Sequence, residues 1–236
     1  MTAVFSRSAA EASAVEAPRV PLRYLLEFAL DGETPGRVLN DQGVRSLMPY
    51  LRGPGTLVEL GGVGDYYKNF APDQPYTVTN FQEPCDQLID MTKMDFADNS
   101  VDAFLSMFAL EHIYDFQTVI EECFRSLKPG GRMLLGVPWM YYYHGAPDDF
   151  FRFSVSALDE MLQQWNVLRK VSFGNRNLLV CQLFHEKKAL GHHGSWPVTQ
   201  ARRLMTMPFL MAGLLGNQHS PVYAITQLYL CEKPVT

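Results

Sequence analysis

The chain has 236 residues, of which 47% are hydrophobic and 19% charged, enough apolar material for one domain with a full core. Its formal net charge is -5 and no basic run stands out, which argues against a nucleic-acid partner. Its four cysteines are far apart and form no C-x-x-C pair. They therefore indicate reduced thiols in a cytosolic protein, rather than disulfides or a zinc site.

Neither the N-terminus nor the later apolar stretches predict targeting to a membrane. Residues 1–20 lack the apolar core of a signal peptide, so we expect a cytoplasmic protein with a flexible N-terminus. The most apolar late stretch, residues 204–215, is shorter than the roughly 20 apolar residues that span a bilayer. We expect residues 21–236 to form a single domain.

The first elements alternate between helical patterns and short apolar stretches. Helices are expected over residues 22–30 and 40–51, and Asn40 or Asp41 can cap the second. Stretches typical of strands follow at residues 56–60, 76–81, 86–91, 101–110 and 132–139. A strong helical pattern begins after Asp115, between the last two of these strands. This alternation predicts an α/β fold with a parallel sheet.

The remaining elements predict a C-terminal insertion. A helix is expected over residues 153–165, capped by Ser154 or Ser156, and strands over residues 167–175 and 223–234. Residues 176–222, between these strands, are too long for a hairpin and must contain helices of their own. This insertion could cover an acceptor, close the core or form a dimer contact.

Groups suited to ligand binding follow four of the predicted strands. In an open α/β sheet, ligands bind beyond the carboxyl ends of the strands. The groups are, in chain order, Glu59 with Gly61, Gly62 and Gly64, then Asn80, then Asp90, then Phe108, Ala109, Glu111 and His112. Each signal alone is weak, since a glycine cluster after a strand is more often only a turn. Their order and spacing together are much more specific.

Three segments carry a resemblance to a known family. "TLVELGGVG", "DFADNSVDAFLSMFALEHI" and "ECFRSLKPGGRMLLGVP" resemble the class I S-adenosylmethionine-dependent methyltransferases of the small-molecule type. The resemblance covers about residues 55–165. It implies a Rossmann-like fold with a mostly parallel seven-stranded sheet, an antiparallel last strand and a helical lid insertion at residues 176–222. It also implies S-adenosylmethionine as cofactor.

The resemblance assigns cofactor contacts to individual residues. The glycine turn would pass under the methionine part, and Glu59 would orient its ammonium. Asn80 stands where the family usually has an acidic residue that holds both ribose hydroxyls. The remaining contacts would be Gly61, Gly62 and Gly64 in the turn, Asp90 and Met91 at the adenine, and Phe108 and Ala109 near the sulfonium, with Glu111 and His112 beginning the next helix.

Two departures from the family pattern bear on cofactor affinity. Val63 and Asp65 occupy the second and third glycine positions of the usual E-x-G-x-G-x-G turn. Asn80 keeps the shape of the acidic residue but loses its charge. A charge-assisted hydrogen bond is worth roughly 1.5–3 kcal/mol, against about 1 kcal/mol for a neutral one. We therefore expect cofactor binding about tenfold weaker than with an acidic residue.

The catalytic candidates lie mainly in "MYYYHGAPDDFFRFS", residues 140–154. Methyl transfer requires alignment, and a base when the nucleophile carries a proton. His144 is the first general-base candidate because an unperturbed imidazole has a pKa near 6.5; alternatively, it only bonds backbone. His112 is a second candidate, with a structural donor as the alternative. Asp149 completes the catalytic set.

The same region supplies acceptor-binding candidates, namely Tyr141, Tyr143, Asp148 and Arg152. Alternatively, Asp149 and Arg152 form an ion pair that fixes the loop to the following helix. His192 and His193 have no carboxylate or cysteine at ligand spacing, so we expect a solvated loop there and no metal.

The sequence thus predicts methyl transfer to oxygen or nitrogen of a small molecule, such as a sugar or secondary metabolite. One alternative is a cyclase or rearrangement enzyme in which S-adenosylmethionine does not react or is absent. Another is a non-catalytic partner subunit, and the protein could also form a homodimer.

Overall fold

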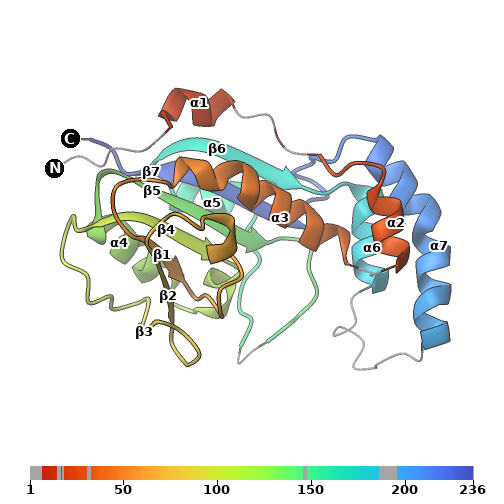
Figure 1. Ribbon diagram of the computed structural model, residues 1–236, viewed down its shortest axis with the longest axis horizontal. Helices are drawn as coiled ribbons and strands as arrows, with labels where there is room; N and C mark the ends of the chain where they lie inside the picture. Colours follow the sequence, from red (N-terminus) through yellow and green to blue (C-terminus); the bar gives the residue numbers. More distant parts are fainter. Residues whose placement is uncertain are drawn as a thin grey trace.

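The computed structural model describes residues 7–14, 17, 19–30, 33–145, 148–185 and 196–235. Seven strands form one sheet in the order β3-β2-β1-β4-β5-β7-β6 (Figure 1). They are β1 (Leu57–Leu60), β2 (Tyr76–Asn80), β3 (Gln87–Leu88), β4 (Val101–Met107), β5 (Leu127–Pro138), β6 (Asn166–Phe173) and β7 (Thr226–Glu232). Strands β1 to β5 pair in parallel, whereas β7 is antiparallel to both β5 and β6. The predicted sheet is therefore confirmed.

Helices cover both faces of this sheet and one end of it (Figure 1). The α-helices are α1 (Ala9–Ala14), α2 (Tyr24–Leu30), α3 (Pro35–Leu47), α4 (Phe116–Ser126), α5 (Val155–Met161), α6 (Arg176–His185) and α7 (Trp196–Leu215). Short 3-10 helices are η1 (Met48–Tyr50), η2 (Lys68–Phe70) and η3 (Leu110–His112). α3 packs on one face, and α4 and α5 pack on the other.

The arrangement of strand β4 shows why its sequence is a nearly continuous apolar run. Ala103 and Leu105 belong to the core that includes α3, whereas Phe104 belongs to the core that includes α4 and α5. Successive side chains point to opposite faces of a strand, so a strand covered on both faces is apolar at most positions rather than at every second one. The prediction of a doubly buried strand here is confirmed.

The start of α3 was predicted wrongly. The helix begins at Pro35, and the Thr34 side chain caps it by accepting a hydrogen bond from the Arg37 N–H. Asn40 and Asp41, the predicted caps, lie inside the helix. Threonine followed by proline is itself a helix-start signal, because the proline lacks only an N–H that has no helical partner.

The connection from β1 to β2 contains a second difference. The sequence suggests that Tyr66 and Tyr67 start a crossover helix, but they lie in turns that lead to the single 3-10 turn η2. Tyr67 is buried and its hydroxyl accepts a hydrogen bond from Asn40 Nδ2 at 3.0 Å, while the Tyr66 hydroxyl donates to Asp41. Helix α3 thus contacts the segment where a crossover helix was expected.

The predicted helices of the insertion are α6 and α7, which pack together at one end of the sheet (Figure 1). In addition, α6 contacts α3, and α7 contacts α2. Asn175 fixes the entry to α6, since Oδ1 accepts from the Leu178 N–H and Nδ2 donates to the Gly213 carbonyl of α7. His192 and His193 lie outside the described residues. Near the N-terminus, α1 forms within the segment predicted to be flexible.

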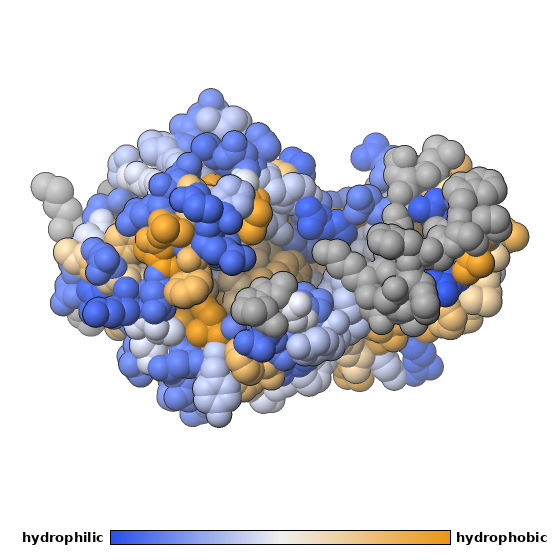
Figure 2. Space-filling model, turned by 90° about the horizontal axis from the view of Figure 1, so that it is seen from below, coloured by the Kyte–Doolittle hydropathy of each residue, from blue (hydrophilic) through white to orange (hydrophobic). Residues whose placement is uncertain are grey.

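The helical end presents apolar surface, part of which appears orange on the face seen in Figure 2. Exposed large side chains of α7 are Val198, Leu204, Met205, Phe209, Met211 and Leu215. Among the helices that the structure describes, none is both long enough and apolar enough to cross a membrane.

Candidate active site

The strand order reverses between β1 and β4, and the chain segments that leave these two strands touch there. Gly61 has a φ of +75°, and a Cβ added to it would lie 2.5 Å from the Ala109 Cβ. It would also lie 3.9 Å from the Met91 Cε, so the chain after β3 reaches the same place. A residue with a side chain at Gly61 would be strained and would collide with Ala109. The structure thus brings three predicted cofactor residues together.

Glu59 lies beneath this turn with its side chain enclosed. It is 3% exposed, and its Oε2 accepts a hydrogen bond from the Tyr76 hydroxyl at 2.7 Å. A Cβ on Gly62 would lie 2.5 Å from the Glu59 carboxyl carbon, so glycine leaves the space that the carboxyl fills. Burial raises the pKa of Glu59 to about 7. A cation placed beside it would favour the ionised carboxylate.

Both ends of the Asn80 amide form hydrogen bonds, and one of them binds the glycine turn. Nδ2 donates to the Gly62 carbonyl at 2.9 Å, and Oδ1 accepts from the Phe81 N–H at 2.7 Å. An amide oxygen has two lone pairs, so Oδ1 retains one for a further donor such as a ribose hydroxyl. An acidic residue could not make the bond to Gly62. The sequence does not reveal this use of the amide.

Two further cofactor candidates occupy distinct surroundings. Asp90 is exposed, and its Oδ1 accepts from both the N–H and the hydroxyl of Thr92, which lowers its pKa. Phe108 has a φ of +55°, and its N–H donates to the Gly136 carbonyl at 2.8 Å. A bulky residue in the left-handed region is uncommon and marks a backbone that its surroundings constrain.

A second group of polar residues lies two positions after Ala109, around the fully buried Glu111. Within the described part of the chain, neither carboxylate oxygen of Glu111 has a hydrogen-bond partner of good geometry. Two imidazoles approach Oε1 instead, with His144 Nε2 at 3.5 Å and His112 Nε2 at 3.7 Å. The His112 and His144 rings meet edge to face, 5.0 Å apart. We call Glu111, His112 and His144 the Glu-His cluster.

Both imidazoles are anchored through their other nitrogen. His144 Nδ1 lies 3.1 Å from Asp149 Oδ2, and the same oxygen accepts from the His144 backbone N–H at 2.9 Å. His112 Nδ1 forms a short hydrogen bond with the Asp148 backbone carbonyl. The contact with Glu111 raises the pKa of His144 more than burial lowers it. The structure thus brings the three predicted catalytic residues, His144, His112 and Asp149, into one group.

Arg152 holds Asp149 and the loop. It binds both Asp149 oxygens and also donates to the carbonyls of Tyr141 and Tyr142. Burial alone would raise the pKa of Asp149, but these bonds and the His144 N–H lower it to about 2. The ion pair that the sequence offered as an alternative role is therefore present, and it occupies the Arg152 guanidinium.

The other acceptor candidates differ in their exposure. Tyr141 is half-buried, stacks on Tyr142 with ring centroids 4.5 Å apart, and lies 5.2 Å from the His144 ring. Tyr143 is 71% exposed. Asp148 contributes its backbone carbonyl to the cluster and is exposed. Of these, Tyr141 lies nearest in structure to the predicted base.

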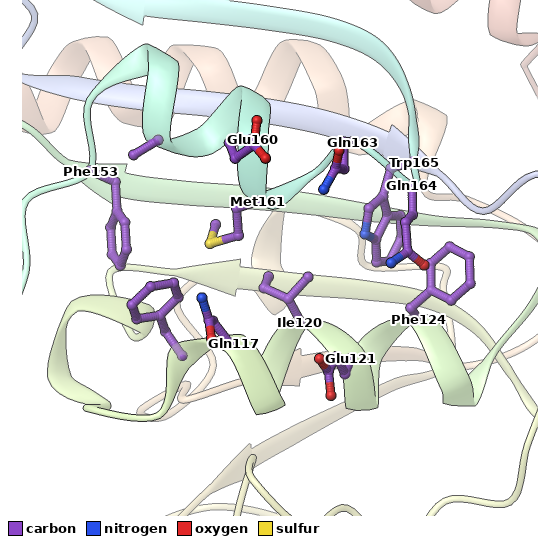
Figure 3. Close-up of a pocket in the computed structure, with 12 residues that line it drawn as sticks. Gln117, Ile120, Glu121, Phe124, Phe153, Glu160, Met161, Gln163, Gln164 and Trp165 are labelled. Atoms are coloured by element: carbon purple, nitrogen blue, oxygen red, sulfur yellow. The ribbon is translucent and has the colours of Figure 1, made fainter.

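A groove of about 490 Å³ lies elsewhere, between α4 and α5 (Figure 3). Phe124 and Trp165 close one end of it, and Ile120 and Met161 lie between the helices (Figure 3). None of the predicted cofactor or catalytic residues lines this groove. It is therefore separate from the strand ends.

Comparisons with known proteins agree with the fold. Residues 70–135 match the family model described as "Methyltransferase domain", and no curated protein matches the sequence. Three solved structures share the fold. A SAM dependent methyltransferase from Archaeoglobus fulgidus is 13% identical, with 90% of this chain and 100% of that chain covered and a TM-score of 0.56.

The second is the [4+2]-cyclase SpnF, 18% identical, with 93% of this chain and 99% of that chain covered and a TM-score of 0.57. The third is a chain from the Haloferax volcanii complex between the Trm112 methyltransferase activator and a methyltransferase. It is 19% identical, with 89% of this chain and 97% of that chain covered and a TM-score of 0.50. At such identities the likeness shows the fold alone.

The sheet order and the strand-end site define a methyltransferase-type α/β fold. Residues 70–135 match a methyltransferase domain within this fold, so the predicted resemblance to the class I S-adenosylmethionine-dependent methyltransferases is supported by both the family model and the sheet.

Proposed function

We propose that the protein transfers a methyl group from S-adenosylmethionine to an oxygen or nitrogen atom of a small-molecule acceptor. The observation that carries this proposal is the junction of Gly61 with Ala109, which lies over a buried Glu59 and two residues from the Glu-His cluster. One side of the junction suits a cationic cofactor, and the other carries groups that can accept a proton. Methyl transfer to a protonated nucleophile needs both.

The cofactor would bind across the ends of β1 to β4. Glu59 would pair with its ammonium, and the remaining lone pair of Asn80 Oδ1 would accept from a ribose hydroxyl. Val63 is 66% exposed, so its side chain does not fill the turn. Asp90 and Met91 would face the adenine, and Phe108 would flank the sulfonium.

The acceptor would lie beside His144. Its oxygen or nitrogen attacks the methyl carbon as the bond from carbon to sulfur breaks, which leaves S-adenosylhomocysteine and releases one proton. His144 Nε2 is the atom best placed to take this proton, because Asp149 holds Nδ1 and Glu111 stabilises the imidazolium that forms. We expect α6 and α7 to cover a sugar or secondary metabolite, and the reaction to take place in the cytoplasm.

A cyclisation or rearrangement without methyl transfer is the second candidate. It is favoured by the altered turn, in which the Asn80 amide is committed to Gly62, and the fold is shared with a [4+2]-cyclase. A non-catalytic subunit is a third, since the fold is also found in a complex with a methyltransferase activator. The mass of the product separates the first two, because only methyl transfer adds one methyl group.

The first experiment is calorimetric titration of the full chain with S-adenosylmethionine, with thermal unfolding in parallel. We expect saturable binding and a higher melting temperature. Release of S-adenosylhomocysteine is then screened across hydroxyl- and amine-bearing acceptors, with His144→Gln expected to keep cofactor binding and lose turnover. Glu160→Gln, at an exposed position of α5 beside the groove that is separate from the strand ends, is the control. The absence of heat and of stabilisation at millimolar cofactor would refute the proposal.

A further inference from the structure

We propose that Glu111, His112 and His144 form a binding site for one divalent transition-metal ion of the Zn²⁺ type. One potential ligand atom from each residue lies within 4.8 Å of the other two. The Glu111 Oε1 atom is 3.5 Å from His144 Nε2 and 3.7 Å from His112 Nε2. Zinc ligands bind at about 2.0–2.2 Å in a tetrahedron, which places them roughly 3.3–3.6 Å apart. Small side-chain movements would therefore complete the site.

The anchoring of the two imidazoles is a separate observation that points to a metal. A histidine that ligates a metal almost always donates its other N–H to a carboxylate or a backbone carbonyl. His144 Nδ1 faces the Asp149 carboxylate, and His112 Nδ1 bonds the Asp148 carbonyl. In this tautomer each Nε2 carries a lone pair, and both Nε2 atoms face the same carboxylate oxygen.

Glu111 supplies the charge for such a site. Its side chain is 0% exposed, and both oxygens are buried without a hydrogen-bond partner of good geometry among the described residues. A buried carboxylate is costly unless a cation or hydrogen bonds compensate it. One divalent ion between the three residues would satisfy the carboxylate and both imidazole lone pairs together.

The site would also be reachable. The side chains of His112 and His144 are 22% and 20% exposed, so the ion would not be sealed on every side. Two histidines and one glutamate with an open position form a ligand set that catalytic zinc sites use. A bound ion would also fit a hydroxyl oxygen of the acceptor in that position.

The site follows from geometry alone, and only its use in catalysis rests on the proposed function. With an ion bound, the His144 Nε2 lone pair is donated to the metal, so His144 no longer takes the acceptor's proton. The ion would instead lower the pKa of an acceptor hydroxyl that binds to it. The proton of that hydroxyl would pass to solvent. The methyl transfer would otherwise be the same, with S-adenosylhomocysteine and one proton as the other products.

The test is titration of the full chain, freed of metal by chelation, with Zn²⁺ in a calorimeter and with Co²⁺ in an absorption spectrometer. We expect one ion per chain. His144→Ala and His112→Ala should each weaken binding by more than about 100-fold, and Asp149→Asn, which only positions His144, by about 10–100-fold. The matched control is His192→Ala with His193→Ala, which removes two histidines that are not among the proposed ligands and should leave binding unchanged.

Two results would overturn the inference: the absence of saturable one-to-one binding, or binding that survives His144→Ala and is lost in the control. If a variant does not fold, NMR of the imidazole nitrogens in the unmodified chain tests the site instead. Only the signals of His112 and His144 should shift when Zn²⁺ is added. Cofactor binding and turnover are measured separately. Metal binding without methyl transfer supports the site and refutes the proposed function, whereas methyl transfer without metal binding does the reverse.

Discussion

Replacing Glu59 with glutamine should stabilise the protein at neutral and alkaline pH while weakening the binding of S-adenosylmethionine. The carboxyl is 3% exposed, and burial raises its pKa from 4.5 to about 7. Between these two values the native state retains a proton that the unfolded chain releases. The free energy of unfolding therefore falls as pH rises through this window, and remains lower above it. One pKa unit corresponds to 1.36 kcal/mol, so the total loss is about 3 kcal/mol.

Glutamine at this position can still accept the Tyr76 hydrogen bond, but it has no proton to lose. The stability of Glu59→Gln should therefore exceed that of the unmodified chain by an amount that grows from near zero at about pH 4.5 to about 3 kcal/mol at about pH 8. Urea unfolding across this range measures the difference, and groups that titrate equally in both chains cancel. Glu27→Gln, at an exposed position of α2, is the control and should give parallel curves.

The same variant tests the place of the cofactor's ammonium. An ionised Glu59 would attract it, so cofactor affinity should increase with pH near 7 in the unmodified chain and be weak and nearly constant in Glu59→Gln. If the two stability curves run parallel, the carboxyl does not have a raised pKa. If the stability curves diverge but cofactor affinity is unchanged, Glu59 is buried as described but does not bind the ammonium.

Three further predictions concern the turn and the cluster. Gly61→Ala and Gly64→Ala should each lose about 1–2 kcal/mol of stability in urea unfolding because both glycines have a positive φ. Gly61→Ala should lose more, because only its added Cβ would collide with the Ala109 side chain. From charge alone, the sequence predicts that Asn80→Asp would bind the cofactor more tightly. The structure reverses this expectation, because aspartate loses the donor to the Gly62 carbonyl, so calorimetry should show binding weaker by about 1–3 kcal/mol; tighter binding would contradict this. In metal-free protein, NMR titration should give His144 a pKa above 6.5 that Glu111→Gln lowers, whereas an unchanged pKa would rule out their pairing.

Much of the fold could be predicted because its signals are local. The apolar run of β4 and the helical spacing of α4, with Asp115 accepting from the Thr118 N–H, depend on residues close in sequence. The number of strands and the antiparallel last strand were implied by the family resemblance, and the order of the strands was not predicted, since a periodic pattern does not say which strands pair. The start of α3 was missed although its threonine-proline signal is local.

The crossover after β1 could not be predicted in this way. Tyr66 and Tyr67 are compatible with a helix, but their hydroxyls bond residues of α3, more than twenty positions earlier in the chain. These contacts compete with local helix formation, and tertiary packing commonly overrides weak propensity. Asn80 poses the same difficulty, because whether its amide serves the cofactor or the turn depends on where the Gly62 carbonyl points.

The candidate site was predicted as separate residues, and the structure shows how they are connected. Residues 108–112 link the cofactor turn to the Glu-His cluster, and hydrogen bonds hold this segment near both ends. The Phe108 N–H donates to the Gly136 carbonyl, and the Glu111 carbonyl accepts from the Phe150 N–H, each at 2.8 Å. In the proposed function, a segment held in this way would fix the distance from the cofactor's sulfonium to the proton acceptor or the proposed metal. Alignment of the reacting groups would therefore depend on this one stretch of backbone, while α6 and α7 would choose the acceptor.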